Sequence, residues 1–142
     1  MNTENSLIFS FTGITTSFKD NLDKHLKEIG LHGGQAFVLF SLWREDGQSQ
    51  IALAHKLNLS APTINKMVKS LSKNGYVDCQ KCESDGRLIR VYLTQKGLEC
   101  RGSVEEQWTK MENVFFSALT ETEKLIFQQI LEKLKQNLKT TV

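Results

Sequence analysis

SAPTINKMVKSLSKNGYVDCQKCESDGRLIRVYLTQKG, residues 60–97, is the stretch of sequence that decides the fold. It begins with Ser60, a residue type favoured at helix N-caps, and Pro62 falls in the first helical turn, where its missing N–H is an amide without a helical partner. Apolar residues then recur every three or four positions until Asn74-Gly75 ends the pattern. The apolar stripe is Ile64, Met67, Val68 and Leu71, and the outward residues are Thr63, Asn65, Lys66, Lys69 and Lys73. This pattern predicts an amphipathic helix from Ser60 to Asn74 with a polar and basic outer face.

A second short helix is expected just before this one. Residues 50–57, QIALAHKL, offer apolar side chains for packing, and Asn58-Leu59 breaks the pattern before Ser60. Two helices joined by a break of three or four residues, the second with a basic outer face, are typical of a helix-turn-helix. The side chains expected to pack are Ile51, Leu53, Ala54 and Leu57.

The residues after Gly75 predict a β-hairpin. Tyr76-Val77 and residues 88–93, LIRVYL, have the composition of strands, and the polar stretch between them ends in the turn signal Ser84-Asp85-Gly86. A hairpin that directly follows a helix-turn-helix is a wing.

Helices are also expected before this centre. Apolar residues keep a helical period from Ile8 to Ile29, which predicts a helix over 5–29 that stops at Gly30, a residue suited to a left-handed cap. Residues 35–43, QAFVLFSLW, are apolar on nearly every side, which favours a short buried helix.

Two more helices are expected after the wing. Thr94 caps a long helix whose apolar positions keep the helical period as far as Ala118. Thr120-Glu121-Thr122-Glu123 is a capping box that opens the last helix. The apolar positions of that helix are Leu125, Ile126, Ile130, Leu134 and Leu138.

The predicted fold is mainly α-helical with a small β-hairpin wing, in a single domain of residues 1–142. Residues 33–97 would form the winged helix-turn-helix part, flanked by dimerisation helices over 5–30 and 98–140. The apolar stripes of these flanking helices exceed what one small winged domain covers. Since a second copy offers the same stripes, we expect a two-fold homodimer.

Positive charge is concentrated in the middle of the chain. Residues 48–97 carry eight Lys and Arg against three acidic residues, a net charge of +5, whereas the remainder carries 10 basic and 13 acidic residues, a net charge of −3. This asymmetry favours a centre that binds a polyanion such as double-stranded DNA. The start of the chain lacks the pattern of a signal peptide and no apolar run spans a bilayer, so we expect a cytoplasmic protein with no membrane partner.

The three cysteines, Cys79, Cys82 and Cys100, are an odd number, and a chain of this size buries a core without disulfides. Cys79 and Cys82 form a C-x-x-C motif, but structural zinc needs four ligands, and no second pair of Cys or His follows at suitable spacing. We therefore expect no metal and no cofactor. Redox sensing by Cys79 or Cys82 stays open, because oxidation close to bound DNA would disturb docking.

Residues 53–97, LAHKLNLSAPTINKMVKSLSKNGYVDCQKCESDGRLIRVYLTQKG, resemble the MarR family of bacterial transcriptional regulators, and the order of predicted elements extends the resemblance over essentially the whole chain. Its most specific part is the spacing from Gly75 through Asp85-Gly86-Arg87 to Val91 and Leu93–Gly97. This spacing is similar to the G-[LY]-[IV] … D-x-R … V-x-L-T-x-x-G wing pattern of the family. The resemblance implies a regulator, usually a repressor and not an enzyme, that binds a pseudo-palindromic operator as a homodimer and is released by a small effector or oxidant.

The resemblance also implies which residues meet the DNA. The helix from Ser60 to Asn74 would enter the major groove, and Arg87 at the wing tip would reach the minor groove or its phosphates while Asp85 holds the hairpin. Two positions depart from the family, since Gly86 stands where an arginine is common and Cys79 where a basic residue is common. The implied DNA-binding residues are Ser60, Thr63, Asn65, Lys66, Lys69, Lys73 and Arg87.

Many members of the family bind small aromatic or anionic effectors where the long helices meet the winged part. By resemblance, the lining of such a pocket in this chain would be Phe11, Ile14, Phe18, Phe40, Arg44 and Arg101, with the arginines neutralising a carboxylate or phenolate. The structural alternative is that these aromatic residues only fill the core.

Two other functions stay open at this point. One is a winged-helix module that binds protein and not DNA. The other is a thiol enzyme that uses Cys79 or Cys82 with a histidine, although the sequence offers neither a glycine-rich loop nor a nucleophile elbow.

Overall fold

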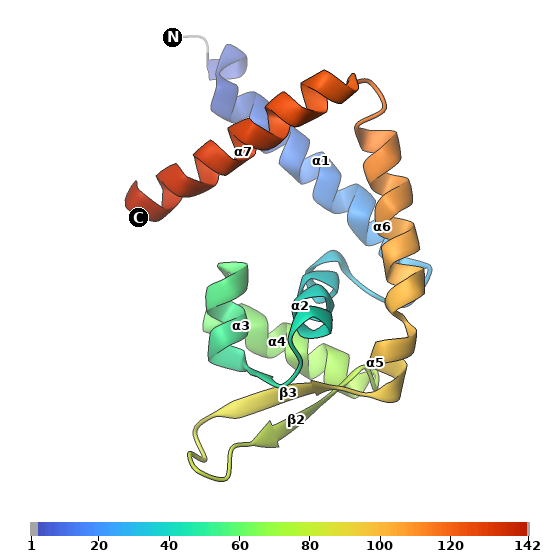
Figure 1. The fold of residues 1–142 in the computed structure, drawn as a ribbon, viewed down its shortest axis with the longest axis vertical. Helices are drawn as coiled ribbons and strands as arrows, with labels where there is room; N and C mark the ends of the chain where they lie inside the picture. The colour runs from blue at the N-terminus through green and yellow to red at the C-terminus, as the bar shows by residue number, and fades with distance from the viewer. Residues whose placement is uncertain (1–2, 142) are drawn as a thin grey trace. The chain divides into compact units, whose positions relative to one another are not determined.

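The computed structural model describes residues 3–141, which form two compact units, one reaching to Trp108 and one beginning at Thr109. The fold is mostly helical with one small antiparallel sheet (Figure 1), so the predicted fold class is confirmed. Among the described residues, no helix is both long and apolar enough to cross a membrane.

The elements follow the predicted order. A single 3₁₀ turn, Thr3–Asn5, precedes the first helix. The helices are α1 (Leu7–Lys27), α2 (Gly33–Arg44), α3 (Gln50–Leu57), α4 (Ala61–Lys73), α5 (Gln95–Glu99), α6 (Arg101–Phe115) and α7 (Glu121–Thr141). The strands are β1 (Gln48–Ser49), β2 (Val77–Lys81) and β3 (Ile89–Leu93).

Local signals in the sequence set the ends of these helices. Ser60 caps α4, since its hydroxyl accepts from the backbone N–H of Thr63 at 3.3 Å. The chain leaves α1 and α4 through Gly30 and Gly75, whose φ angles of 80° and 81° lie in the left-handed region that favours glycine. Asn58 has a φ of 53° and ends α3 in the same way. These caps confirm the breaks expected from the sequence.

The sheet is larger than the predicted hairpin. Its strand order is β1-β3-β2, and both pairs are antiparallel, with Cys79 opposite Val91 and Gln48 also opposite Val91 on the other side of β3. The short strand β1 was not expected. It is held by the buried side chain of Gln48, whose amide donates to the backbone oxygens of Ser41 at 2.8 Å and Glu45 at 2.6 Å.

The first wing strand is also longer than expected. Strand composition was found at Tyr76-Val77, but β2 runs from Val77 to Lys81. Residues 78–81 are exposed and polar, so their composition does not indicate a strand. They are extended because each pairs with a residue of β3.

The core of the first unit lies between α2, α3, α4 and the sheet. The fully buried side chains there include Leu39, Leu53, Ile64, Val68, Leu71 and Val91. Ile51 was expected to pack, and this prediction is wrong, because its side chain is 69% exposed at the start of α3. Within α3, Leu53 is fully buried, and the expected packing residues Ala54 and Leu57 are half-buried.

The long helix expected from Thr94 to Ala118 is two helices. The helical ladder reaches the bond from Cys100 N to Lys96 O and resumes with the bond from Val104 N to Cys100 O. Between them, the carbonyl of Gly97 accepts from the indole Nε1 of Trp43 at 2.8 Å. A side chain that enters the ladder in this way bends or breaks a helix, which explains why the single-helix prediction is wrong.

The second unit contains the end of α6 and all of α7. Thr120 and Glu123 form the predicted capping box, with Thr120 N donating to Glu123 Oε1 at 3.0 Å and Glu123 N donating to Thr120 Oγ1 at 3.2 Å. Within this unit, Phe116 packs on Phe127 with ring centroids 5.8 Å apart. The expected apolar stripe of α7 is exposed in the single chain, at Leu125, Ile126, Ile130, Leu134 and Leu138.

Candidate nucleic-acid interface

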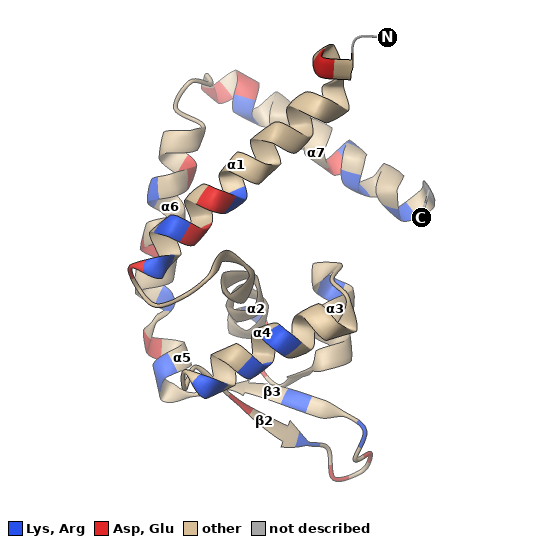
Figure 2. Cartoon of the chain, turned by 180° about the vertical axis from the view of Figure 1, so that it is seen from behind, with Lys and Arg blue, Asp and Glu red and all other residues tan. Residues whose placement is uncertain are grey.

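Helix α4 separates an apolar face from a basic one. Ile64, Val68 and Leu71 are fully buried, while Asn65, Lys66, Lys69 and Lys73 are exposed. In Figure 2 the Lys and Arg positions recur along α4, and no acidic residue interrupts them on this helix. The structure therefore brings together, on one exposed face, four of the five outward residues that the sequence assigned to DNA.

The start of α4 is less open than its middle. The hydroxyl of Ser60 lies 2.8 Å from that of Thr63, and it also accepts the Thr63 backbone N–H. Thr63 is half-buried, whereas Ser60 is exposed. Both hydroxyls already have a hydrogen-bond partner in the free protein. Ser60 and Thr63 therefore serve first to cap the N-terminus of α4.

Helix α4 is held rigidly on the rest of the unit. The buried Gln35 of α2 donates from Nε2 to Ser70 Oγ at 2.8 Å, and its Oε1 accepts from His32 N at 3.0 Å. A Cβ added to Gly34 would lie 2.4 Å from Met67 Cε, so α2 and α4 approach closely at this glycine. These contacts fix the orientation in which α4 presents its basic face.

The wing turn is ordered by Asp85. Its Oδ1 accepts from Arg87 N at 3.0 Å, and its backbone oxygen accepts from Leu88 N at 3.0 Å. The hydrogen bond from Cys82 N to Leu88 O at 2.8 Å joins the two ends of the wing loop. Asp85 is thus placed to support the hairpin, and the Arg87 side chain is exposed at its tip.

The wing carries two further cations that were not among the predicted DNA-binding residues. Lys81 ends β2 and Arg90 lies on β3, where its Nη1 donates to Gly47 O at 3.0 Å. Both are exposed, and Figure 2 shows basic positions on both wing strands. Lys81 lies opposite Ile89 and Arg90 lies opposite Gln80, so the two cations are on opposite faces of the hairpin and no common spacing in the sequence indicated them.

The wing cysteines are in different surroundings. The hydroxyl of Ser84 lies 3.1 Å from Cys82 Sγ, and this contact, with the backbone amides of Asp85 and Ser84, lowers the pKa of Cys82 to about 7. Burial raises the pKa of Cys79, and the charge of Asp78 adds to this effect. All three cysteines are free thiols. Within residues 3–141, His, Cys, Asp and Glu side chains do not gather into a group of three that would hold a metal.

The structure brings only part of the predicted effector lining together. Phe18 and Phe40 both meet the ring of Trp108, at centroid distances of 6.5 and 4.9 Å, and Phe40 also meets Trp43 at 5.5 Å. Arg101 lies 5.9 Å from the Trp43 ring and pairs with Glu105 at 2.7 Å. We call Phe18, Phe37, Phe40, Trp43 and Trp108 the aromatic cluster.

The remaining predicted lining residues are solvent-accessible. Phe11 and Ile14 lie on α1 with 48% and 53% of their side chains exposed, and Arg44 is exposed at the end of α2. Trp108, whose ring meets those of Phe18, Phe37 and Phe40, was not among the predicted lining residues. Trp108 lies on the same face of α6 as the predicted lining residue Arg101, and this helical spacing could have indicated it.

Comparison with known proteins adds to this geometry. A model of the MarR family matches residues 32–89, which run from the start of α2 to the first residue of β3. The chain is similar to the HTH-type transcriptional repressor IacR of Pseudomonas putida, with 29% identity over 124 residues that cover 87% of this chain and 74% of IacR.

Two solved structures extend the similarity to the fold. A MarR transcriptional regulator from Methanosarcina mazei Go1 is 26% identical, with a TM-score of 0.82 over 94% of this chain and 99% of that one. Reduced AbfR bound to DNA is 30% identical, with a TM-score of 0.79 over 97% of this chain and 92% of AbfR.

Proposed function

This chain belongs to the MarR family of transcriptional regulators, and from that premise we propose that it is a repressor that binds a pseudo-palindromic operator as a homodimer. MarR-family proteins are transcription regulators and not enzymes, so the thiol-enzyme alternative is set aside. A small aromatic or anionic effector, or an oxidant, would release the DNA.

The observation that carries the proposal is the rigid, basic outer face of α4. A helix of this size fits the major groove, where side chains near its N-terminal end meet base edges. Asn65 and Lys66 occupy that position, and Lys69 and Lys73 follow toward the phosphates. Arg87, Lys81 and Arg90 give the wing a charge that suits the adjacent backbone.

The homodimer is proposed from the apolar faces of the outer helices. Leu7 and Ile8 at the start of α1 are 90% and 76% exposed, and the stripe of α7 is exposed as well. A second copy would cover these faces and would place two α4 helices about one turn of DNA apart, in successive major grooves.

The aromatic cluster is where we expect an effector to act. Flat rings from α1, α2 and α6 meet there, and the cation of Arg101 lies over Trp43. Aromatic walls with one cation suit a small aromatic anion. Because Arg101 is already paired with Glu105, such a ligand would have to compete for its guanidinium.

The alternative of a protein-binding winged helix makes a different prediction about salt. If α4 and the wing neutralise phosphates, the logarithm of the association constant falls steeply and linearly with the logarithm of the salt concentration. Fluorescence anisotropy of a labelled duplex at several salt concentrations measures this slope. Affinity that does not depend on salt, or no binding to duplex DNA, favours the protein-binding module.

A double variant, Lys66→Ala with Arg87→Ala, tests whether the assigned residues of α4 and the wing bind DNA. We expect at least about a tenfold loss of duplex affinity and a shallower salt slope, because two contacts to the DNA are removed. The matched control is Lys19→Ala with Lys24→Ala on α1, which removes the same charge away from α4 and the wing. Equal losses in both double variants would contradict the assigned interface.

A further inference from the structure

The carbonyl of Gly97 is the point where the chain between the wing and α6 departs from a helix. It accepts from Trp43 Nε1 at 2.8 Å and from the thiol of Cys100 at 3.4 Å. In a continuous helix this carbonyl would accept from the backbone N–H four residues later, that of Arg101. Within the described chain, the ladder instead resumes at Val104.

Helix α5, on one side of this point, is clamped to the end of α4. Thr94 Oγ1 donates to Gly75 O at 2.6 Å, and Lys96 Nζ donates to Asn74 O at 2.8 Å. A Cβ on Gly97 would lie 2.2 Å from the backbone oxygen of Tyr76, so α5 touches the segment that follows α4. Any movement of α5 therefore moves the end of α4 and the base of the wing.

Helix α6, on the other side, carries Trp108 into the aromatic cluster. Trp43 belongs to the same cluster through its ring and reaches Gly97 through its N–H. The indole is thus the link between the aromatic rings of the first unit and α5. The ribbon of α5 lies beside one end of α4 (Figure 1).

We propose that Trp43 is a positioning residue for DNA binding, and that its N–H holds the α5–α6 junction bent by occupying the carbonyl of Gly97. When the indole turns away, Gly97 O accepts from Arg101 N instead, and α5 and α6 join into one helix. The local sequence favours that joined form, since Thr94 to Ala118 keeps a helical period throughout.

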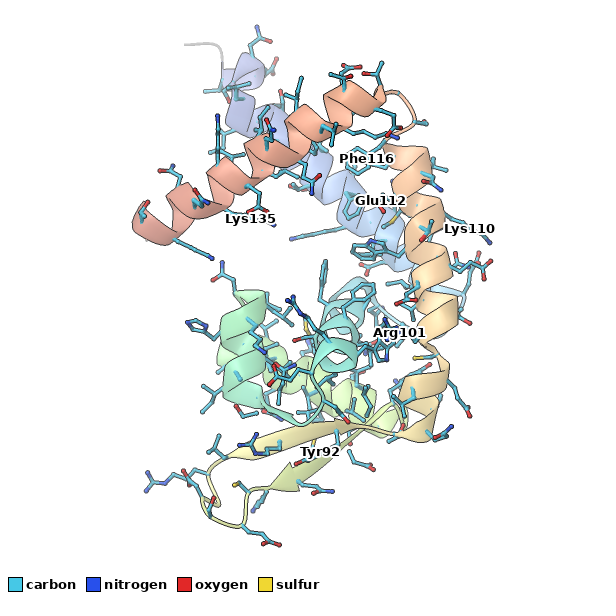
Figure 3. All side chains as sticks on the ribbon, in the orientation of Figure 1. Tyr92, Arg101, Lys110, Glu112, Phe116 and Lys135 are labelled. Atoms are coloured by element: carbon cyan, nitrogen blue, oxygen red, sulfur yellow. The ribbon has the colours of Figure 1, made fainter. Side chains whose placement is uncertain are left out.

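The two forms differ in the direction in which α6 leaves the first unit. Figure 3 labels Arg101 at the start of α6, next to this junction. In the proposed homodimer, on which this inference rests, that direction sets the spacing of the two α4 helices. Because this hydrogen bond has two alternative states, a ligand bound in the aromatic cluster would change the position of the DNA-binding surface by favouring one of them.

The test compares Trp43→Phe with Trp108→Phe. Both remove one indole from the aromatic cluster and keep a ring, but only the first removes the donor to Gly97. In Trp43→Phe we expect slower hydrogen exchange of the amides of Arg101, Gly102 and Ser103, because they gain helical acceptors. We also expect about tenfold weaker binding to a labelled mixed-sequence duplex of about 30 base pairs.

The exchange measurement separates positioning from a general loss of stability. If Trp43 only supports the core, exchange quickens throughout the first unit in Trp43→Phe, and the Arg101 amide gains no protection; this result overturns the inference. Unchanged duplex affinity in Trp43→Phe, with the wild-type protein binding normally, overturns it as well. Failure of the wild-type protein to bind duplex DNA would instead reject the proposed function, and the exchange data would still report on the junction.

Discussion

Cys82 and Cys79 share the wing, but only Cys82 has a thiol that ionises near neutral pH. The hydroxyl of Ser84 and the amides of Ser84 and Asp85 lower its pKa to about 7, whereas burial raises the pKa of Cys79 and of Cys100. The thiolate is the form that reacts with oxidants and alkylating agents. Of the two wing cysteines proposed for redox sensing, Cys82 is therefore the one that an oxidant would attack first.

This difference predicts selective labelling. Iodoacetamide should modify Cys82 before Cys79 or Cys100, with a rate that rises through a midpoint near pH 7. Ser84→Ala should move that midpoint upward, since the thiolate loses its hydroxyl partner, while Ser103→Ala should leave it in place. Mass spectrometry of the labelled peptides gives the rates. Faster labelling of Cys79, or an unmoved midpoint in Ser84→Ala, would contradict the description of this thiol.

Gly97 is expected to tolerate no side chain. A Cβ there would meet Tyr76 O at 2.2 Å, so Gly97→Ala must push α5 away from the end of α4 and should lower the free energy of unfolding by about 2 kcal/mol. Gly102→Ala is the matched control, because nothing lies within 4 Å of its added Cβ and alanine favours a helix. Urea unfolding measures both. Equal stability of the two variants would refute the close packing at Gly97.

At the scale of the elements, the capping box of α7 links stability to pH. Hydrogen bonds to the backbone and side chain of Thr120 lower the pKa of Glu123 below its ordinary value of 4.5. Because the folded pKa is depressed, the cap stabilises α7 above pH 4.5 and loses this effect as the pH falls through the folded pKa.

Glu123→Gln isolates this contribution, since glutamine still accepts the Thr120 amide but does not titrate in this range. We expect the stability difference between the wild-type protein and Glu123→Gln to shrink as the pH falls from 6 to 3. Thermal unfolding followed by circular dichroism at each pH gives that difference. A difference that stays constant over this range would show that the Glu123 carboxylate makes no special contact.

The elements also show what the sequence could predict. The helix ends depend on local chemistry, such as the hydroxyl of Ser60 and the left-handed glycine Gly75, and those predictions are confirmed. The break at Cys100 depends on Trp43, which is far away in the sequence, and periodicity does not contain that information. Strand β1 was missed for the same reason, since a buried Gln48 and pairing with β3 hold it extended.

In the candidate site, too, the sequence predicted the features that depend on local sequence and missed those that depend on distant contacts. The basic face of α4 could be predicted because the helical period alone decides which residues face outward. The wing cation Lys81 was missed because the length of β2 is set by pairing with β3 and not by composition. Arg90 lies within the predicted strand of residues 88–93 but was not assigned to the DNA. The family resemblance grouped Phe11 and Ile14 with Phe18, but in the structure the Phe18 ring meets Trp108 whereas Phe11 and Ile14 are 48% and 53% exposed.

At the scale of the whole molecule, the exposed apolar faces predict a dimer. Ile130 and Leu134 are 45% and 46% exposed on α7, and burying such side chains is strongly favourable. Ile130→Glu with Leu134→Glu should shift the protein from dimer to monomer in light scattering after gel filtration, while the exposed Gln136→Glu should leave the dimer intact. An unchanged dimer mass in the double variant would place the interface elsewhere.

If the proposed homodimer reads DNA sequence through α4, the protein will select its sites from a pool of random-sequence duplexes. We predict an enriched motif with two-fold symmetry, whose half-site centres lie about 10 base pairs apart. The variant with Lys66→Ala and Arg87→Ala should enrich no motif. Folded wild-type protein that enriches no sequence above the starting pool would contradict the account.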